Sequence, residues 1–327
     1  MSSHSDCSPS SLERRDGCSA SCFEESKLVS KDDEAAKRGT RLHKLMEWHL
    51  KRRVNLDNLN EDERTNISKA FEMAEMAMGD EILPDGTTAN GGVWYAEVKL
   101  LSKSTAAAGH NDWGTCDLLV VYRREKRAVV LDWKFGGGLI HHPKWNLQLQ
   151  CYIADAWDWL AEKFGPEAYE FVMETTYIQP AAAEKYEWNP WVFEPDERHR
   201  IVAKIRAVRE RAYSGVREYV VGPACDMCEA KKKGTCWARQ QMFKELLPLA
   251  GIQSTEALDP VALGRAIDAA EVVRQEADRI WDLLKGSVSM CQNVDGWLFA
   301  EKGNRLYRKV TDRTRISEPF HLRMNNH

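Results

Sequence analysis

The sequence predicts a mixed α/β (α+β) fold, and two observations support this expectation. In the middle of the chain, two amphipathic helical segments are followed by three strand-like segments, a further helix and a fourth strand. The composition is that of a globular protein, since 43% of the 327 residues are hydrophobic and 29% are charged. A chain of this length can bury one large core, with or without appendages.

Two helices are expected in the first quarter of the chain. The segment Glu34–Arg52 places apolar residues and a histidine at helical spacing, and Glu61–Met78 has an inner face of the same kind. The preceding residues 1–34 are Ser-rich and then charged, so we expect a loosely structured lead-in there. The stripe on the first helix consists of Leu42, Leu45, Met46 and His49.

The central sheet is predicted from three successive apolar segments, Val93–Leu101, Thr115–Arg123 and Lys126–Phe135. The charged turn RREK joins the second and third segments as a hairpin. A helix over Asn146–Phe164 follows and is stopped by a Gly-Pro pair, and a fourth strand covers Glu170–Ile178.

The C-terminal third is expected to add helices and a hairpin. A helix is predicted over Pro195–Tyr213, and a charged helical stretch over Pro260–Met290, after a cysteine-rich segment. The segment GWLFAEKGNRLYRKV has the pattern of a β-hairpin. The expected regions are a lead-in (1–34), a core (35–215), a cysteine region (216–247) and a C-terminal helix and hairpin appendage (248–327).

Ionisable residues interrupt all three central strands. Asp132 and Lys134 lie two positions apart in one strand, so their side chains share a face. Asp117 on the strand before, and Glu97 on the strand before that, bring further carboxylates into the same sheet. These groups repel one another unless a cation lies between them, so the pattern predicts a site for Mg²⁺ or Mn²⁺. A solvated edge strand is the alternative interpretation.

Such a site is suited to phosphodiester hydrolysis. Mg²⁺ and Mn²⁺ keep open positions for phosphate oxygens. A lysine beside the ion can position or deprotonate the attacking water and stabilise the charge that develops as the bond breaks.

The segments GTCD, DWK and QLQCY, in this order and spacing, resemble the PD-(D/E)XK nuclease superfamily, in the branch of RecB-type nuclease domains and Cas4 exonucleases. Within that branch, SPSSLERRDGCSAS, RGTRLHKLMEW and the cysteine cluster are most similar to phage-encoded exonucleases of the DUF2800 type. The resemblance covers roughly residues 8–240. It implies a restriction-endonuclease-like core, with a central mixed β-sheet flanked by helices.

The resemblance gives roles to individual residues. Asp117 and Asp132 match the metal-binding aspartates, and Lys134 matches the lysine that serves the nucleophilic water. His43 matches a histidine that adds a metal ligand from the N-terminal helix. Read alone, His43 is typical of a helix surface.

Two further positions match the Q-x-x-x-Y motif of the same branch. Gln148 and Tyr152 lie one helical turn apart, where they would orient the lysine or touch the DNA backbone. Without the resemblance they form an ordinary half-buried helix face. Glu97 is expected to act behind the metal ligands or to contact the substrate.

Nine cysteines in a chain with no recognisable secretion signal indicate metal or cluster ligation rather than disulfides. Cys116 and Cys151 are expected in the core. Some members of the RecB and Cas4 branch hold a [4Fe-4S] cluster that joins the chain ends, and structural Zn²⁺ is the alternative. Cys22 could replace the first of the four ligands that the resemblance implies, which are Cys18, Cys225, Cys228 and Cys236.

Contacts with DNA are expected from local patches, because the net charge of −4 excludes a generally basic surface. Lys231 and Lys232 would contact phosphates or form a solvated charge run, and Arg305 and Arg308 belong to the most basic segment of the chain. Most tryptophans are expected in the core, although some could stack on bases of a single strand.

The expected function is therefore a metal-dependent exonuclease that acts on DNA ends in phage replication or recombination. A phage single-strand-binding or annealing protein is a possible partner. Alternatives are a catalytically silent DNA- or partner-binding module and a Cas4-like nuclease that processes CRISPR spacers. The polar N-terminus and the absence of a long apolar run predict a cytoplasmic protein without a membrane segment.

Overall fold

The computed structural model describes residues 5, 7–28, 34–51, 55–136, 140–182, 190–220, 222–241, 297–300 and 305–308. The chain divides into two units, Met1–Lys232 and Lys233–His327. The division after Lys232 lies within the predicted cysteine region and before the expected break at residue 248. The predicted lead-in, the predicted core and the part of the cysteine region up to Lys232 therefore belong to one unit.

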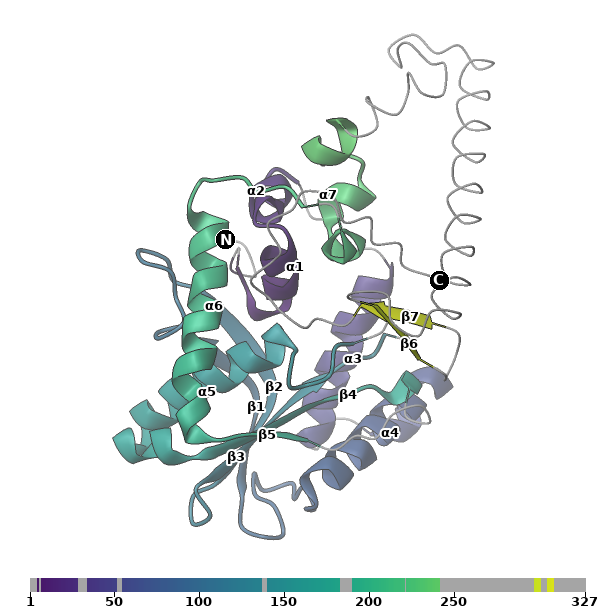
Figure 1. The fold of residues 1–327 in the computed structure, drawn as a ribbon. Coiled ribbons are helices and arrows are strands. Elements are labelled where there is room, and N and C mark those ends of the chain that lie inside the picture. The colour runs from purple at the N-terminus through teal and green to yellow at the C-terminus, as the bar shows by residue number, and fades with distance from the viewer. Residues whose placement is uncertain are drawn as a thin grey trace. The chain divides into compact units, whose positions relative to one another are not determined.

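A five-stranded mixed sheet forms the centre of the first unit (Figure 1). Its strands are β1 (Val93–Leu101), β2 (Trp113–Tyr122), β3 (Arg127–Trp133), β4 (Val172–Ile178) and β5 (Trp191–Phe193), in that spatial order. Strands β3 and β4 are parallel and the other neighbours antiparallel. Four of these strands lie where the sequence predicts them, and β5 was not predicted.

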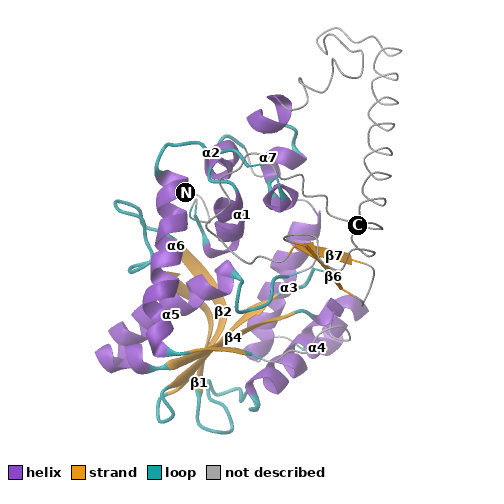
Figure 2. Ribbon diagram, viewed as in Figure 1, coloured by secondary structure: helices purple, strands orange, loops and turns teal. Residues whose placement is uncertain are grey.

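Helices cover both faces of this sheet (Figure 2). On one face, α3 (Glu34–Leu50) and α4 (Glu61–Met78) pack on alternate residues of β2 and β3. On the other face, α5 (Leu147–Phe164) and α6 (Arg198–Tyr213) pack on the intervening residues. All four helices were predicted from the sequence, α3 and α4 from their apolar spacing. The first unit is therefore a mixed α/β domain with helices on both sides of its sheet.

The N-terminal segment is helical rather than loose. A 3₁₀ turn (Pro9–Ser11) leads into α1 (Leu12–Gly17) and α2 (Ala20–Ser26). Leu12 is fully buried in the core beneath α5, and the Arg15 guanidinium is held by Glu25 at 2.6 Å. The expectation of a loosely structured lead-in is therefore wrong for residues 7–28, because tertiary contacts outweigh the polar composition.

Short elements complete the described chain. Further 3₁₀ turns cover Leu56–Asn58, Pro166–Glu170, Pro180–Ala182, Pro195–Glu197 and Pro223–Met227, and α7 covers Glu229–Lys232. None of the described helices has the length and apolar character needed to cross a membrane.

The second unit contains a two-stranded antiparallel sheet of β6 (Trp297–Ala300) and β7 (Arg305–Arg308). These strands agree with the predicted hairpin. The predicted helix over Pro260–Met290 and the hairpin turn lie outside the described residues.

Candidate metal centre

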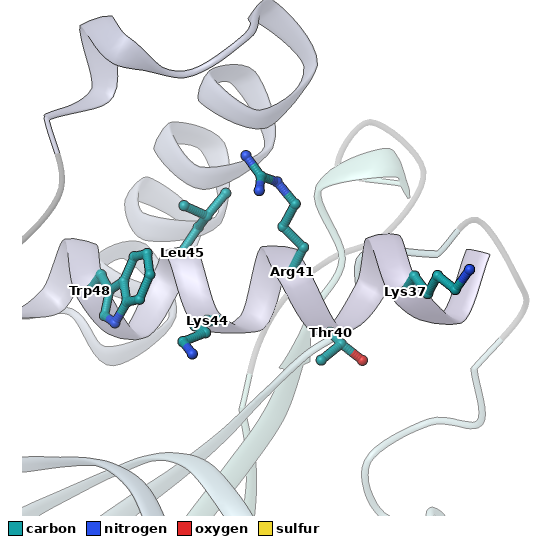
Figure 3. A pocket seen from close by; sticks show the side chains of 6 residues that line it. All are labelled: Lys37, Thr40, Arg41, Lys44, Leu45 and Trp48. Carbon is teal, nitrogen blue, oxygen red and sulfur yellow. The ribbon is translucent and has the colours of Figure 1, made fainter. Parts of the chain in front are cut away.

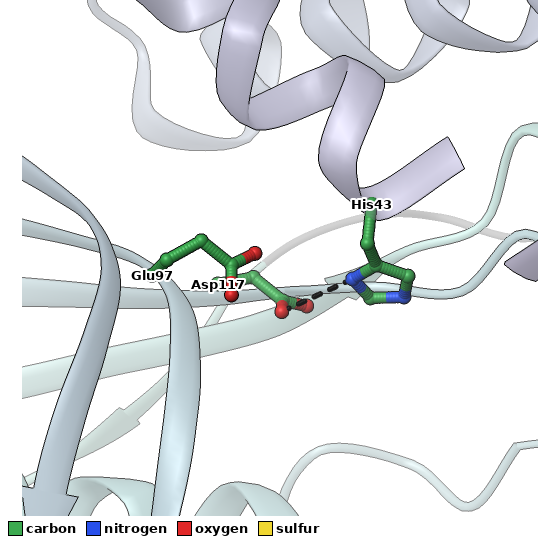
Figure 4. A group of neighbouring side chains, drawn as sticks. All are labelled: His43, Glu97 and Asp117. Carbon is green, nitrogen blue, oxygen red and sulfur yellow. Dashed lines mark hydrogen bonds and ion pairs between the residues drawn. The ribbon is translucent and has the colours of Figure 1, made fainter. Parts of the chain in front are cut away.

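Three potential metal ligands meet at the junction of α3, β1 and β2. His43 projects from α3, Glu97 from β1 and Asp117 from β2, and one ligand atom of each lies within 4.8 Å of the others (Figure 4). Nδ1 of His43 is 3.2 Å from Oδ1 of Asp117. An imidazole and two carboxylates at this spacing form a donor set suited to Mn²⁺ or Mg²⁺.

An irregularity in β1 places Glu97 at this point. Its φ of 55° lies in the left-handed region, which costs about 1–3 kcal/mol for a residue other than glycine. Ala96 and Val98 on either side keep the same register with β2, but Ala96 packs towards α3 and α4 whereas Val98 packs towards α5. The strand thus exchanges its two faces at Glu97, directly opposite Asp117.

The carboxylate of Asp117 is fixed by β3. Its Oδ2 accepts a hydrogen bond of 2.6 Å from the backbone N–H of Trp133, while Oδ1 faces His43. The Trp133 side chain is buried beneath α3 and α4, so this part of β3 is held firmly. One oxygen of Asp117 is therefore oriented towards the other two candidate ligands without further rearrangement.

A second group of side chains, from β3 and α5, continues the site. Oδ2 of Asp132 lies 2.6 Å from Nζ of Lys134. The Gln148 amide spans this pair, because its Oε1 accepts from Lys134 at 2.9 Å and its Nε2 donates to Asp132 Oδ1 at 2.8 Å. Tyr152, one turn further along α5, lies 3.3 Å from Gln148 Nε2. The (D/E)-x-K pair and the Q-x-x-x-Y motif predicted from the sequence are thus in contact.

Burial and crowding shift the protonation of these groups. Burial raises the pKa of Asp132, and the Asp117 charge adds to that shift against the opposing effect of Lys134. Burial and the Asp117 charge raise the pKa of Glu97 to about 7. Burial lowers the pKa of His43, but its hydrogen bond with Asp117 and the nearby carboxylates outweigh this and raise it overall. The site therefore has more acidic groups than its own cations balance.

Asp132 adds a buried carboxylate close to His43 and Asp117. Its Oδ2 is paired with the Lys134 ammonium at 2.6 Å. A carboxylate in this place is an oxygen donor of the kind that Mg²⁺ and Mn²⁺ prefer. Glu97, expected only behind the ligands or on the substrate, lies among the potential ligands. Its position opposite Asp117 in an antiparallel pair is the signal that could have identified it.

The predicted DNA-contacting residues lie apart from this group or in the second unit. Lys231 and Lys232 on α7 form ion pairs with Asp226 at 2.6 Å and Glu229 at 2.7 Å. These pairs reduce their availability to phosphates. Arg305 and Arg308 are the first and last residues of β7 in the second unit.

The N-terminal helices lie beside two of the predicted cluster cysteines. Burial raises the pKa of the Cys18 thiol, and the nearby Cys225 and Cys228 raise it as well. A Cβ on Gly17 would meet the Cβ of Ala224 at 2.5 Å, so only glycine allows this approach. Cys236 belongs to the second unit.

The structure separates the two candidates for the distant ligand. The Cys22 thiol is hydrogen-bonded to Cys7, and this bond together with burial raises the pKa of Cys7. Both side chains are buried. Cys18, rather than Cys22, therefore faces Cys225 and Cys228. Cys116 and Cys151 are fully buried in the core, as predicted.

A family described as "Protein of unknown function (DUF2800)" matches residues 4–320. No curated protein matches the chain. The expected similarity to the DUF2800 type is confirmed, whereas the wider nuclease resemblance stays a prediction.

Proposed function

We propose that this chain, which belongs to the DUF2800 family, is a divalent-metal-dependent nuclease that hydrolyses phosphodiester bonds at DNA ends. The observation that supports the proposal is the meeting of His43, Glu97 and Asp117 at one point of the sheet, beside the Asp132–Lys134 pair. The proposal includes a restriction-endonuclease-like core and, as the resemblance implies, a role in phage DNA replication or recombination.

The metal would be held by His43, Glu97 and Asp117, with Asp132 as a further oxygen donor. Mg²⁺ or Mn²⁺ supplies a Lewis acid for the phosphate oxygens and lowers the pKa of water at the site. The fixed orientation of Asp117 by the Trp133 N–H supports this assignment, because a ligand that is already oriented need not be ordered on binding.

Lys134 would position the attacking water and stabilise the developing negative charge. Its ammonium is held by Asp132 and by the Gln148 amide oxygen, so its place does not depend on the flexible lysine chain alone. Gln148 is in turn oriented by its hydrogen bond to Asp132 and its contact with Tyr152. We assign Gln148 and Tyr152 a positioning role.

The proposal also includes a [4Fe-4S] cluster, with structural Zn²⁺ as the alternative. Cys18, Cys225 and Cys228 are the ligands from the first unit, and Cys236 is the fourth ligand predicted from the sequence. Thiolates bind either kind of centre.

Cleavage of end-labelled DNA tests the proposed nuclease. Single-stranded and duplex substrates are incubated with Mg²⁺, Mn²⁺ or EDTA, and products are resolved by length. We expect cleavage from the ends with either metal and none in EDTA. Asp132→Asn should lower the cleavage rate at least about 100-fold. Mutation of a group that only orients a metal ligand typically lowers activity roughly 10–100-fold, and loss of a donor to the metal should cost at least as much.

The control variant is Asp158→Asn, since Asp158 is also buried and ion-paired, with Arg198 at 2.8 Å, but is not among the residues of the candidate metal centre. It should keep its activity per folded molecule. Absence of metal-dependent cleavage by the unaltered protein would overturn the proposal, and DNA binding without cleavage would instead support the silent binding module. Cleavage that persists in Asp132→Asn would overturn the site assignment.

A further inference from the structure

A basic and aromatic groove lies on α3, outside the candidate metal centre (Figure 3). Its volume is about 320 Å³. Among the described residues, its wall combines three cationic side chains with one large aromatic ring. The lining residues are Lys37, Thr40, Arg41, Lys44, Leu45 and Trp48.

The spacing of these residues aligns them along the helix. Lys37, Arg41, Lys44 and Trp48 follow one another at intervals of four, three and four residues, which is the repeat of one helical face. At the usual rise of an α-helix, the groove is about 16 Å long. It is thus a linear track rather than a closed pocket for a small molecule.

The charges along the track are incompletely neutralised. Arg41 forms an ion pair with Glu63, and Lys37 lies 2.8 Å from Glu34 at an exposed position. Lys44 forms no ion pair with a carboxylate among the described residues, and its Nζ lies 5.2 Å from the centre of the Trp48 ring. An exposed cation next to an aromatic ring is a combination that suits a polyanion with flat bases.

Trp48 is the exposed end of this track, with 38% of its side chain accessible. The buried face of α3 is formed by other residues, among them Leu42 and Met46, which lie in the core. Trp48 is therefore not required to fill the core. Such a ring can stack on an unpaired base, an interaction that tolerates any base type.

The track and the metal centre share a helix. His43, a candidate metal ligand, directly precedes Lys44 in α3, so the metal centre lies beside the middle of the track, about 100° further round the helix.

We propose that the α3 groove binds the single-stranded DNA that adjoins the scissile bond, an inference that rests on the proposed nuclease function. Lys37 and Lys44 contact phosphates, and Trp48 stacks on a base. A single strand is the occupant because stacking needs a base that is free of its neighbours in a duplex. The groove thereby gives the enzyme a preference for a frayed or single-stranded end.

Binding is measured by fluorescence anisotropy of labelled oligothymidylate, with the Asp132→Asn protein in EDTA so that cleavage is suppressed. Trp48→Ala should weaken binding about tenfold, and Trp48→Phe should restore most of the affinity. Lys44→Gln should reduce the slope of log K against log salt by about 0.7, the value for one lost contact with a single-strand phosphate.

The matched control is Lys163→Gln on α5, which packs on the opposite face of the sheet. Nζ of Lys163 lies 4.6 Å from the Trp159 ring, an arrangement like that of Lys44 and Trp48. The affinity of Lys163→Gln for oligothymidylate should equal that of the parent protein. Unchanged affinity in both Trp48→Ala and Lys44→Gln would overturn the proposed groove. A loss of affinity for blunt duplex DNA equal to the loss for oligothymidylate would overturn its preference for a single strand.

Cleavage by the otherwise unaltered protein is measured in parallel, so that the two proposals fail separately. Normal cleavage by the unaltered protein, with oligothymidylate affinity unchanged by both Trp48→Ala and Lys44→Gln, overturns the groove proposal alone. Loss of affinity in Trp48→Ala, with no cleavage by the unaltered protein, supports DNA binding by the groove and overturns the proposed nuclease function.

Discussion

Gln148 joins the two charged residues that the proposed chemistry needs. Its amide accepts from Lys134 and donates to Asp132, so it sets the distance between them. We predict that Gln148→Ala lowers kcat roughly 10–100-fold with little change in KM, as expected for loss of a group that orients the reacting residues. The measurement is steady-state cleavage of end-labelled DNA.

The control is Gln150→Ala on the same helix. Gln150 is buried, its amide donates to the backbone oxygen of Lys144, and no hydrogen bond joins it to the charged pair among the described residues. This change should lower stability and leave kcat per folded molecule near that of the parent. Equal losses of kcat in both variants would contradict the positioning role.

Glu97 gives the site a dependence on pH that can be measured without DNA. Its pKa is about 7 in the folded protein against an ordinary value of 4.5, so the folded state binds the proton more tightly than the unfolded chain. The ionised carboxylate therefore costs stability, and this cost grows as the pH rises from about 4.5 to about 7.

In metal-free buffer, Glu97→Gln should thus be more stable than the parent above about pH 7, and the difference should disappear near pH 4.5. The raised pKa of His43 also favours the folded state at low pH, but both proteins retain that group. Urea unfolding at several pH values in EDTA gives the comparison. A difference that does not change with pH would show that Glu97 is not strained by its neighbours.

At the scale of single residues, the sequence predicted the chemistry better than the conformation. The period of two placed Asp132 and Lys134 on one face, and the structure confirms their contact. The left-handed backbone of Glu97 has no signal in the apolar pattern, because it depends on the pairing of β1 with β2. That is why Glu97 was assigned a lesser role.

Within β1, the same conformation should appear as strain in the strand itself. We predict that Glu97→Gly is about 1 kcal/mol more stable than Glu97→Ala, because only glycine adopts a positive φ without a steric penalty. Chemical denaturation of both variants gives the difference in free energy of unfolding.

Lys99 provides the control, since it is an exposed residue of the same strand with a regular partner, Thr115. There the order should reverse, with glycine about 0.5–1 kcal/mol less stable than alanine. The same order at both positions would contradict the strained conformation of Glu97.

Helices and strands with a clear apolar period were predicted within a few residues, as α4 and α5 show. The elements missed were short and depended on distant contacts. Strand β5 has only three residues and is fixed by pairing with β4. Helices α1 and α2 are short and lie in a polar part of the chain. They form because residues such as Leu12 and Arg15 are buried against the rest of the unit.

For the molecule as a whole, residues far apart in the chain meet at the N-terminal helices. Cys18 lies near Cys225 and Cys228, which follow it by some 200 residues in the sequence. All three are predicted ligands of the cluster. The order of apolar segments predicted a mixed α/β fold, and the family resemblance implied a sheet flanked by helices. Local patterns could not predict that α1 and α2 pack against the segment around Ala224.

We predict that anaerobically purified protein contains iron and sulfide and absorbs visible light, as a [4Fe-4S] cluster does. Cys18→Ser and Cys225→Ser should lose both the iron and the absorption. Cys22→Ser should keep the iron and the absorption, because the Cys22 thiol is hydrogen-bonded to Cys7. Metal analysis and absorption spectra decide the matter, and a colourless protein with stoichiometric zinc would contradict the cluster.

The central claim is that His43, Glu97 and Asp117 hold one divalent cation. Anomalous diffraction from crystals grown with Mn²⁺ tests it most directly, because the signal locates the ion independently of any activity. We predict an anomalous peak between the imidazole of His43 and the carboxylates of Glu97 and Asp117, lost in Asp117→Asn. A map without a peak there, in crystals saturated with Mn²⁺, would contradict the metal centre.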